Sequence, residues 1–383
     1  MKVAVLGYGT VGKGVHDLLL DAPGFEAGPV LEKDFRPDLP FAVTDLQMIL
    51  DDPTVDAVVE AIGGIEPAYS FGKRVLNSER HFVTSNKVLV AAKGPELASL
   101  AEQNGVAFLF SAACGGAIPF LSNLQTAANS GESILRLQGI LNGTTNYILD
   151  KMQTDGIGFD EALAEAQKLG YAEADPTDDL SGADSIRKMM LACAVTYNQL
   201  PTDGMDMEGI TSFTKEDGEH VHSLGYVCRL KTKAKLVDDT LRAYVEPTLC
   251  PLGSIESAIR LNGNMASYTG DSSGVIYLIG QGAGRYTTAS SVMRDLEQIR
   301  RGKKTMIRSD CRRVTANNED SMHRYYLRAP EHTVDDLLAT VYESGPVTRG
   351  ITDKISVSYM HEFVEELRNE GKEIFFAAVE RIH

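Results

Sequence analysis

Cysteine is scarce in this sequence, and long apolar runs are missing from it. Only five of the 383 residues are cysteines, their number is odd, and no pair has the spacing of metal ligands. So few thiols in a long chain are typical of a reducing compartment, and we expect a cytoplasmic protein. No apolar run reaches about 18 residues, and the N-terminus leads directly into an expected strand rather than a secretory signal. A membrane-spanning or exported chain is therefore not expected.

Positive charge is also in short supply. The chain has 37 lysines and arginines against 53 acidic residues, which gives a formal net charge of -16. This balance argues against nucleic acid or an anionic membrane as a partner. The net charge does not indicate which small molecule the protein binds, because the charge of a local binding site can be opposite to the net charge of the chain. The length and the 43% hydrophobic content predict a globular protein with two or three domains.

A glycine-rich turn follows the first expected strand. Residues 2–6, with the apolar run VAVL, lead into Gly7, Gly9 and Gly12, and a helical pattern of apolar residues begins at Val11. In such a turn the first glycine permits the sharp bend, the second lets the backbone approach a pyrophosphate, and the third lets the helix pack on the strand. The N–H groups that open the helix would face the anion. The motif predicts dinucleotide binding, with a plain strand–helix turn as the alternative.

The residue that would contact the cofactor ribose leaves the choice of cofactor open. A second strand is expected near residues 29–34, at the usual offset from the glycine turn. Glu32 would favour the free 2′-hydroxyl of NAD, whereas Lys33 and Arg36 would favour the 2′-phosphate of NADP. Both cofactors are therefore compatible with the sequence.

Strands and helices alternate through the first third of the chain. Strands are expected at 55–62, 81–84 and 106–110, and helices at 67–77 and 97–103. This alternation predicts a doubly wound, mostly parallel sheet.

Two residues follow expected strands of this sheet at the edge where such sheets bind ligands. Gly63 follows the strand at 55–62, and Lys87 follows the strand at 81–84. Lys87 is therefore a candidate site residue, with an ordinary surface lysine as the alternative. Glu60, inside the first of these strands, is unusual because buried acids are rarely unpaired.

The stretch 170–188 concentrates acidic residues next to a lysine. Asp184 and Lys188 are four residues apart on an expected helix, so they share one face. Carboxylates can hold the ammonium group of a small zwitterion while a lysine moves a proton, although a solvated ion pair is the simpler interpretation. The carboxylates of this stretch are Glu173, Asp175, Asp178, Asp179 and Asp184.

A polar turn and a second glycine-rich turn mark the middle of the chain. Asn142 and Thr144 lie between a strand expected at 135–140 and a helix expected at 147–152. They suit a substrate-facing turn, or else Thr144 or Thr145 simply caps the helix. Gly282 precedes another expected helix and either faces the cofactor or allows close packing.

We predict that the last sixty residues or so form a small α+β unit. We expect strands near 323–330, 353–360 and 374–382, with helices at 334–344 and 363–369. Such a unit is either a sensing module or simple packing.

Six segments resemble the homoserine dehydrogenase family, and together they span roughly residues 1–330. The two longest, GILNGTTNYIL and AQKLGYAEADPTDDLSGADSIRK, are specific enough to make a chance match to both very improbable. The six segments are GYGTVGKGV at 7–15, VVEAIGG at 58–64, TSNK at 84–87, ACGGAIPFL at 113–121, and the two long ones at 139–149 and 166–188.

The resemblance implies an α/β protein that catalyses reversible, NAD(P)-dependent hydride transfer between L-aspartate 4-semialdehyde and L-homoserine. The pathway leads to threonine, methionine and isoleucine, and we expect a homodimer or a dimer of dimers. Another amino-acid dehydrogenase, or an inactive nucleotide-binding regulatory protein on the same scaffold, is the alternative. The implied parts are a Rossmann-type domain at 1–133 completed near 282–315, an α+β substrate and dimerisation domain at 134–316, and a degenerate ACT-like appendage at 323–383.

The resemblance also assigns roles residue by residue. Lys188 and Lys87 match the catalytic lysines, either of which could move the proton. Ser111 stands where the family often has a glutamate that helps backbone carbonyls hold Na⁺ or K⁺. The substrate would contact Glu173, Asp184 and Gly170, together with Asn142 and Thr144; the cofactor would contact Gly7, Gly9, Thr10, Val11, Gly12, Gly63, Lys87 and Gly282; and the cation carbonyls would be those of Cys114, Gly116 and Ile118.

Overall fold

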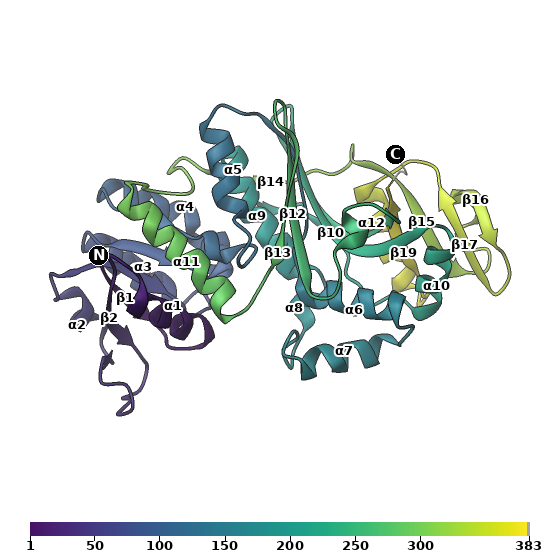
Figure 1. Ribbon diagram of the computed structural model, residues 1–383. Coiled ribbons are helices and arrows are strands. Elements are labelled where there is room, and N and C mark those ends of the chain that lie inside the picture. The colour runs from purple at the N-terminus through teal and green to yellow at the C-terminus, as the bar shows by residue number, and fades with distance from the viewer. Residues whose placement is uncertain (381–383) are drawn as a thin grey trace.

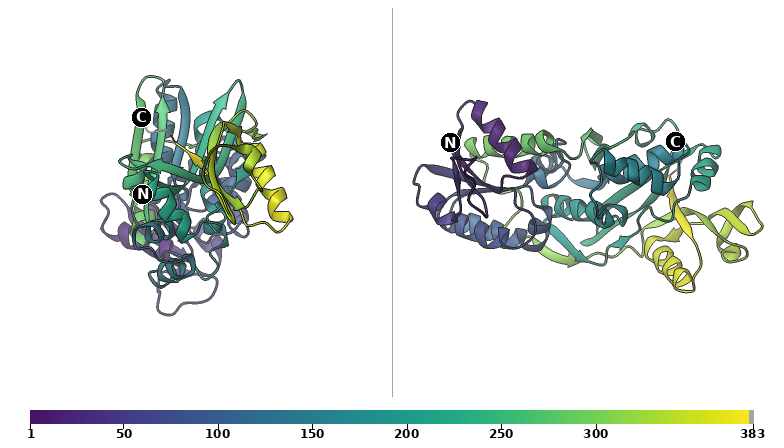
Figure 2. Two further views of the ribbon diagram at one scale, coloured as in Figure 1. Left: turned by 90° about the vertical axis from the view of Figure 1, so that its right-hand side faces the viewer. Right: turned by 90° about the horizontal axis from the view of Figure 1, so that it is seen from below.

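The computed structural model describes residues 1–380 as an elongated molecule with the N-terminal part at one end and the C-terminal part at the other (Figures 1 and 2). Two sheets form its two halves. Among the described residues, no helix combines the length and the apolar character needed to cross a lipid bilayer.

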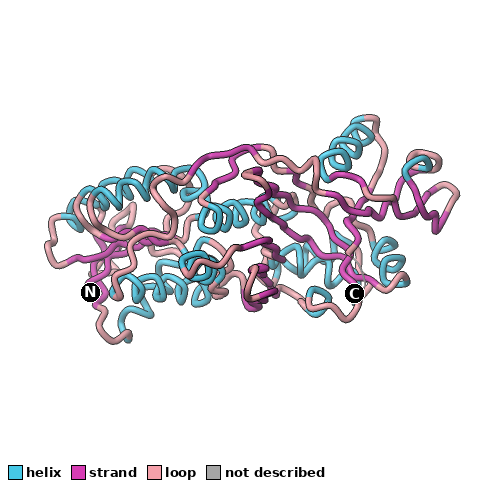
Figure 3. The backbone as a smooth tube through the Cα atoms, turned by 90° about the horizontal axis from the view of Figure 1, so that it is seen from above, coloured by secondary structure: helices cyan, strands magenta, loops and turns pink. Residues whose placement is uncertain are grey.

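The first half contains a six-stranded sheet in which every neighbouring pair is parallel, in the order β3-β2-β1-β4-β5-β6. Its strands carry near-continuous apolar runs, as expected for strands buried on both faces. Helices lie on both sides of it (Figure 3). The doubly wound fold is confirmed. The strands are β1 (Lys2–Leu6), β2 (Glu26–Leu31), β3 (Ala42–Val43), β4 (Val55–Glu60), β5 (His81–Thr84) and β6 (Phe108–Leu109).

The helices of this half include one from far along the chain. α11 (Arg285–Arg300) packs against α1 (Thr10–Asp21), so a late segment completes the first half. α4 begins at Lys87 rather than near residue 97, because Asn86 caps it and Pro95 is accommodated inside it. The other helices are α2 (Leu46–Leu50), α3 (Ala68–Asn77), α4 (Lys87–Gln103) and α5 (Phe120–Asn129).

The second half is built on an 11-stranded sheet whose main path is β13-β12-β7-β10-β11-β19-β15-β17-β16. Its central strands β10 and β11 pair along their whole length. The strands are β7 (Ile134–Ile140), β9 (Asp206–Met207), β10 (Tyr226–Val237), β11 (Thr240–Pro251), β12 (Gly263–Gly270), β13 (Gly274–Gln281), β15 (Met322–Pro330), β16 (Leu338–Glu343), β17 (Val347–Thr352), β18 (Ile355–Ser356) and β19 (Phe375–Val379).

Helices of the second half bring its substrate motifs toward the first half. α9, which carries Asp184 and Lys188, contacts both α4 and α5 of the first half and β10 and β11 of the large sheet. β8 (Gln199–Asp203) and β14 (Arg312–Thr315) form a separate two-stranded sheet. The helices are α6 (Gly143–Thr154), α7 (Phe159–Lys168), α8 (Thr177–Leu180), α9 (Ala183–Tyr197), α10 (Lys215–Ser223) and α12 (Val357–Asn369).

The C-terminal segment differs from its predicted element order. The helix expected at 334–344 is wrong: only a short 3₁₀ turn, Asp335–Leu337, precedes strand β16. Pairing of β16 with β17 overrides the helical pattern. The strand expected at 353–360 is also wrong, because α12 begins at Val357 under a cap from Ser356.

This segment also continues the large sheet. β19 pairs in parallel with β11, which joins residues 322–379 to the second half through main-chain hydrogen bonds. The final expected strand, 374–382, is observed as β19, and its residues 381 and 382 lie outside the described residues. The element order on which an ACT-like appendage depended is therefore not observed.

Candidate active site

One buried carboxylate is shared by two lysines that come from the two halves of the molecule. Lys188 Nζ lies 2.6 Å from Asp184 Oδ2, and Lys87 Nζ lies 3.0 Å from Asp184 Oδ1. Asp184 is buried, and only 12% of the Lys188 side chain is exposed. The structure thus brings together the two predicted lysines and one of the predicted acids.

Lys87 owes its position to a network at the end of β5. Asn86 accepts a hydrogen bond from the Leu89 N–H through Oδ1 and donates one to the Gly64 carbonyl through Nδ2. The Thr84 hydroxyl oxygen accepts the Asn86 N–H at 2.9 Å. Lys87 therefore opens α4 at a fixed place beside the ligand-binding edge of the first sheet.

Asn142 caps helix α6 and also donates hydrogen bonds to two carboxylates of the acidic stretch. Its Oδ1 accepts the Thr145 N–H, and its Nδ2 donates to Asp179 Oδ1 at 2.7 Å and to Asp184 Oδ2 at 2.8 Å. Neither Thr144 nor Thr145 is the N-cap. Asp179 is a site residue that the sequence analysis missed; its only signal was membership of the acidic stretch.

Thr144 anchors the segment that leads into this stretch. Its hydroxyl donates to the Tyr171 carbonyl at 2.6 Å. Gly170 bends the chain with a φ of +76°, which favours glycine. Glu173, on the same segment, is exposed and is not brought to the lysines in the structure.

The charges of the cluster fix its protonation states. Burial alone would lower the pKa of Lys188, but the charge of Asp184 and its hydrogen bond outweigh burial and raise it. Burial would raise the pKa of Asp184, yet Lys188 and Lys87 hold it well below its usual range. Lys188 is thus an ammonium at neutral pH, next to an ionised Asp184. Burial raises the pKa of Asp179, and the Asp184 charge adds to that effect against the Asn142 hydrogen bond.

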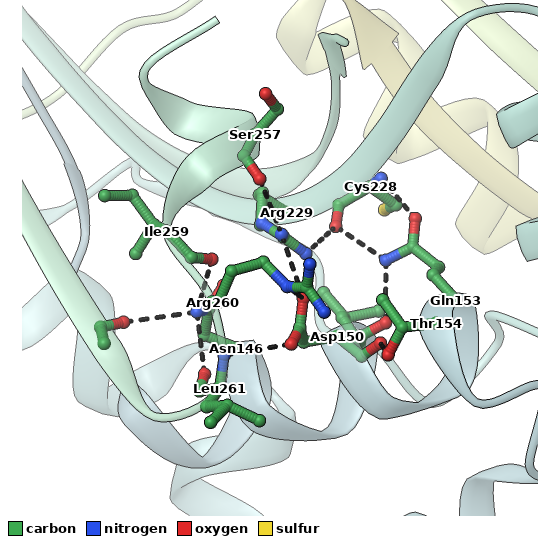
Figure 4. A network of polar contacts seen from close by, with 12 residues as sticks. Asn146, Asp150, Gln153, Thr154, Cys228, Arg229, Ser257, Ile259, Arg260 and Leu261 are labelled. Carbon is green, nitrogen blue, oxygen red and sulfur yellow. Dashed lines mark hydrogen bonds and ion pairs between the residues drawn. The ribbon is translucent and has the colours of Figure 1, made fainter. Parts of the chain in front are cut away.

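A buried polar network holds α6 against the large sheet and the segment that precedes β12 (Figure 4). Asp150 accepts hydrogen bonds from Arg229 at 3.2 Å and from Arg260 at 2.7 Å, and its second oxygen accepts the Leu261 N–H. Asn146 donates to three carbonyls between residues 259 and 263, where the chain enters β12. Since Asn142 caps the same helix, this network holds Asn142 in register with the acidic cluster.

The glycine turn after β1 has the geometry that its motif predicts. Gly7 has a φ of +91°, and a Cβ on Gly12 would lie 1.9 Å from the Gly7 carbonyl oxygen. A Cβ on Gly9 would meet nothing within 4 Å, and no side chain caps α1, so the N–H groups of Thr10 and Val11 face an open approach.

A second turn beside the glycine loop is held by an acid that the sequence marked as unusual. Glu60 is fully buried and accepts the N–H groups of Ile62 at 2.7 Å and Gly63 at 3.0 Å. Thr84 donates to its other oxygen. Gly63 has a φ of +85° and open space around its Cβ position. Glu60 is therefore a structural support of the predicted cofactor edge.

Gly282 and Gly116 meet where the chain crosses between the halves. A Cβ on Gly116 would lie 2.4 Å from the Gly282 carbonyl atoms, and a Cβ on Gly282 would lie 2.1 Å from Asn264 Nδ2. The Ala117 N–H donates to the Gln281 carbonyl at 3.1 Å. Close packing thus requires glycine at both positions.

Two of the three carbonyls predicted to hold a monovalent cation, those of Gly116 and Ile118, already accept hydrogen bonds. The Gly116 carbonyl accepts from the Ser291 hydroxyl, and the Ile118 carbonyl accepts from the Phe120 N–H. The guanidinium of Arg294 donates to the adjacent Ala117 carbonyl at 2.7 Å and places a positive charge there. With two of the three carbonyls engaged and a guanidinium beside them, this loop does not fit a cation site.

Comparison with known families finds two matches along the chain. The model described as "Homoserine dehydrogenase, NAD binding domain" matches residues 7–111, and the model described as "Homoserine dehydrogenase" matches residues 119–296. The boundary between the two matches falls in the loop that carries Gly116.

Individual relatives agree with these matches. A homoserine dehydrogenase of Synechocystis is 38% identical over 321 residues, covering 78% of this chain and 73% of the relative. The enzyme of Bacillus subtilis is 37% identical over 315 residues, covering 78% and 72%. A solved homoserine dehydrogenase from Thiobacillus denitrificans superposes with a TM-score of 0.87 at 28% identity, covering 99% of this chain and 98% of that one.

Proposed function

The chain belongs to the homoserine dehydrogenase family, and on that basis we propose how its own residues carry out the reaction. It is an NAD(P)-dependent oxidoreductase that interconverts L-homoserine and L-aspartate 4-semialdehyde, a step of threonine, methionine and isoleucine biosynthesis. The alternatives, another amino-acid dehydrogenase or an inactive regulatory protein, are not favoured.

The single observation that carries the mechanism is the Asp184 carboxylate between two lysines. As the aldehyde is reduced, negative charge develops on its oxygen, and a nearby ammonium stabilises that charge and gives up a proton. We assign the proton to Lys188, which is the more buried lysine and whose pKa is raised by Asp184. Lys87 supplies a second positive charge from the cofactor side of the cluster. The bound nicotinamide supplies the hydride.

The acids bind the other end of the substrate. Asp184 and Asp179, joined through Asn142, present negative charge to the substrate ammonium group. We propose that Glu173, which is exposed in this structure, adds a third carboxylate when the segment after Gly170 moves toward the site. Holding the ammonium fixes the distance between the reacting carbon and the lysines.

The cofactor is a nicotinamide dinucleotide, and the family match covers its binding domain. Gly7, Gly9, Thr10, Val11 and Gly12 form the proposed pyrophosphate turn, with Gly63 and Gly282 on its flanks. We favour NAD over NADP because Glu32, at the end of β2, accepts the Tyr8 N–H of the glycine turn. Its carboxylate would repel a 2′-phosphate, while Asp38 binds the Arg36 guanidinium through two hydrogen bonds.

We propose that the two halves act as the predicted domains, residues 1–133 with 282–315 binding the cofactor and residues 134–316 binding substrate. The packing of α11 on α1 supports the assignment of residues 282–315 to the first domain.

We also propose a cytoplasmic location, which the five buried free thiols favour.

We further propose a homodimer that forms along β13. This strand is at one edge of the large sheet and exposes three apolar side chains on one face: Val275 at 48%, Tyr277 at 38% and Ile279 at 58%. An apolar row of this kind on an edge strand is an association surface. Sedimentation equilibrium of the purified protein tests it, and a monomer at all concentrations would exclude it.

The activity itself has a direct test. Purified protein with L-homoserine should raise the absorbance at 340 nm, more strongly with NAD than with NADP. A folded protein that binds cofactor but gives no homoserine-dependent rise would refute the proposed mechanism.

A further inference from the structure

Three side chains of α11 hold the loop that connects the first half to the site. Ser291, Arg294 and Asp295 are spaced so that they share one face of the helix. All three reach the loop 111–118. Their partners are the Gly116 carbonyl for Ser291, the Ala117 carbonyl for Arg294, and the N–H and hydroxyl of Ser111 for Asp295.

Asp295 supplies a carboxylate at the start of the loop, although the loop itself has none there. Asp295 Oδ2 accepts the Ser111 N–H at 2.8 Å, and Oδ1 accepts the Ser111 hydroxyl at 2.6 Å. The side chain is completely buried, so both oxygens depend on Ser111 for their hydrogen bonds. The negative charge expected from a glutamate at position 111 is thus provided by a neighbouring helix.

Arg294 supplies the positive charge. Its guanidinium donates to the Ala117 carbonyl at 2.7 Å and to the Ser291 hydroxyl, which in turn donates to the Gly116 carbonyl. A guanidinium is charged at every physiological pH and is weakly hydrated, so it suits a permanent place against carbonyl oxygens. A second cation next to it would meet like charge at close range.

The held loop lies near the charged cluster of the active site. Burial raises the pKa of the Cys114 thiol to about 12, and the charges of Lys188, Asp184 and Lys87 act on the same thiol. Gly116 packs directly on Gly282. A shift of the loop would therefore move both the surroundings of the lysines and the glycine proposed to face the cofactor.

We propose that the Arg294 guanidinium, with Ser291 and Asp295, replaces a monovalent cation as the group that positions the loop 111–118 in this enzyme. Arg294 is a positioning residue, and turnover does not depend on Na⁺ or K⁺. The activity readout rests on the proposed function, whereas the thermal-stability readout below does not.

The first experiment compares Na⁺, K⁺ and choline chloride at equal ionic strength. We expect kcat and the melting temperature to be the same in all three, with differences in kcat below about twofold. Activation by Na⁺ or K⁺ of about fivefold or more, or a higher melting temperature in Na⁺ or K⁺ than in choline, would overturn the proposal. If the wild-type protein shows no dehydrogenase activity, the comparison of melting temperatures in the three salts still tests whether the loop binds Na⁺ or K⁺.

The second experiment replaces Arg294 by alanine, with Arg301→Ala as the matched control. Arg301 is at the end of the same helix, 77% exposed and paired with Glu297, and its removal should leave kcat unchanged. Arg294→Ala should lower kcat by about tenfold or more with little change in cofactor Kd, and added guanidinium chloride at millimolar concentration should restore part of the loss.

Ser291→Ala removes the hydroxyl that donates to the Gly116 carbonyl and accepts from Arg294, but it leaves the Arg294 hydrogen bond to the Ala117 carbonyl in place. It provides a milder variant if Arg294→Ala does not fold. It should lower kcat in the same direction while the KM for cofactor stays within about twofold. Wild-type kcat in both variants, or in whichever of them folds, would show that α11 does not position the loop.

Discussion

Lys87 and Asp184 form an ion pair of 3.0 Å across the junction of the two halves. Lys87 opens α4 beside the parallel sheet, and Asp184 lies in the first turn of α9, which packs on the mixed sheet. The same carboxylate holds Lys188 at 2.6 Å through its other oxygen. The site therefore exists only where the two halves meet, and the relative position of the halves sets the distance between the two lysines.

Replacing Asp184 by asparagine should impair turnover and substrate binding together. The change preserves the shape of the side chain but removes the charge that both lysines share and that raises the pKa of Lys188. We expect kcat to fall and the KM for homoserine to rise, with a combined loss of about a hundredfold in kcat/KM. Steady-state kinetics measures both. A change confined to cofactor affinity would place Asp184 elsewhere in the mechanism.

The two directions of the reaction should respond differently to pH. Homoserine oxidation requires Lys188 to accept a proton, and the pKa of Lys188 is raised above its usual value by Asp184. Below that pKa the unprotonated fraction falls as pH falls, so log kcat for oxidation should rise with a slope of about one between about pH 7 and 10. Reduction, which uses the ammonium form, should vary little over that range.

The Lys87→Met variant is the control for this profile. It keeps Lys188 and Asp184 together, so it should be slower but retain the pH slope of oxidation. A flat pH profile of oxidation in the wild-type enzyme would show that Lys188 is not the proton acceptor. A slope that disappears in Lys87→Met would show the same.

Glu32→Gln should weaken the preference for NAD. The amide can still accept the Tyr8 N–H, but it no longer repels a 2′-phosphate. We expect the ratio of kcat/KM for NAD to that for NADP to fall about tenfold, equivalent to about 1.4 kcal/mol. Glu26→Gln, at the opposite end of β2, should leave the ratio unchanged. An unaltered ratio in Glu32→Gln would mean that the cofactor ribose lies elsewhere.

Asp150→Ala should destabilise the second half of the molecule. It leaves Arg229, which is 1% exposed, without its counter-ion (Figure 4). Breaking a buried pair in this way costs about 3–5 kcal/mol in the free energy of unfolding. Asp155→Ala, directly after α6, loses an exposed hydrogen bond from Thr154 and a partly exposed pair with Lys151, and it should cost about 1 kcal/mol or less. Urea unfolding compares the two, and equal stability of both variants would contradict the role of the network.

The local motifs predicted much of the fold and part of the site. β1 and β5 have the predicted bounds, and Asp184, Lys188, Lys87 and Asn142 meet as their motifs indicated. These features depend on short stretches whose turns and helix caps are determined by residues close to them in the sequence. The same information located the glycine turn of the cofactor edge.

The features that could not be predicted depend on contacts between distant segments. Residues 338–343 form a strand because β17 pairs with them, although their own pattern suits a helix. Asp295 reaches Ser111 because α11 packs on the first half, and no residue near either of them in the sequence indicates that the two form a hydrogen bond. Glu173 is exposed and is not brought to the lysines, so its motif indicated a role that the position of its side chain in this structure does not match.

The most direct test of the mechanism is the effect of Lys188→Met on turnover and on cofactor binding, measured in the same preparation. The variant keeps most of the side-chain volume, so its melting temperature should confirm that it folds. We predict that kcat falls by about 10²- to 10⁴-fold while the Kd for NADH stays within about twofold of wild type. A folded variant with wild-type kcat would show that Lys188 does not transfer the proton.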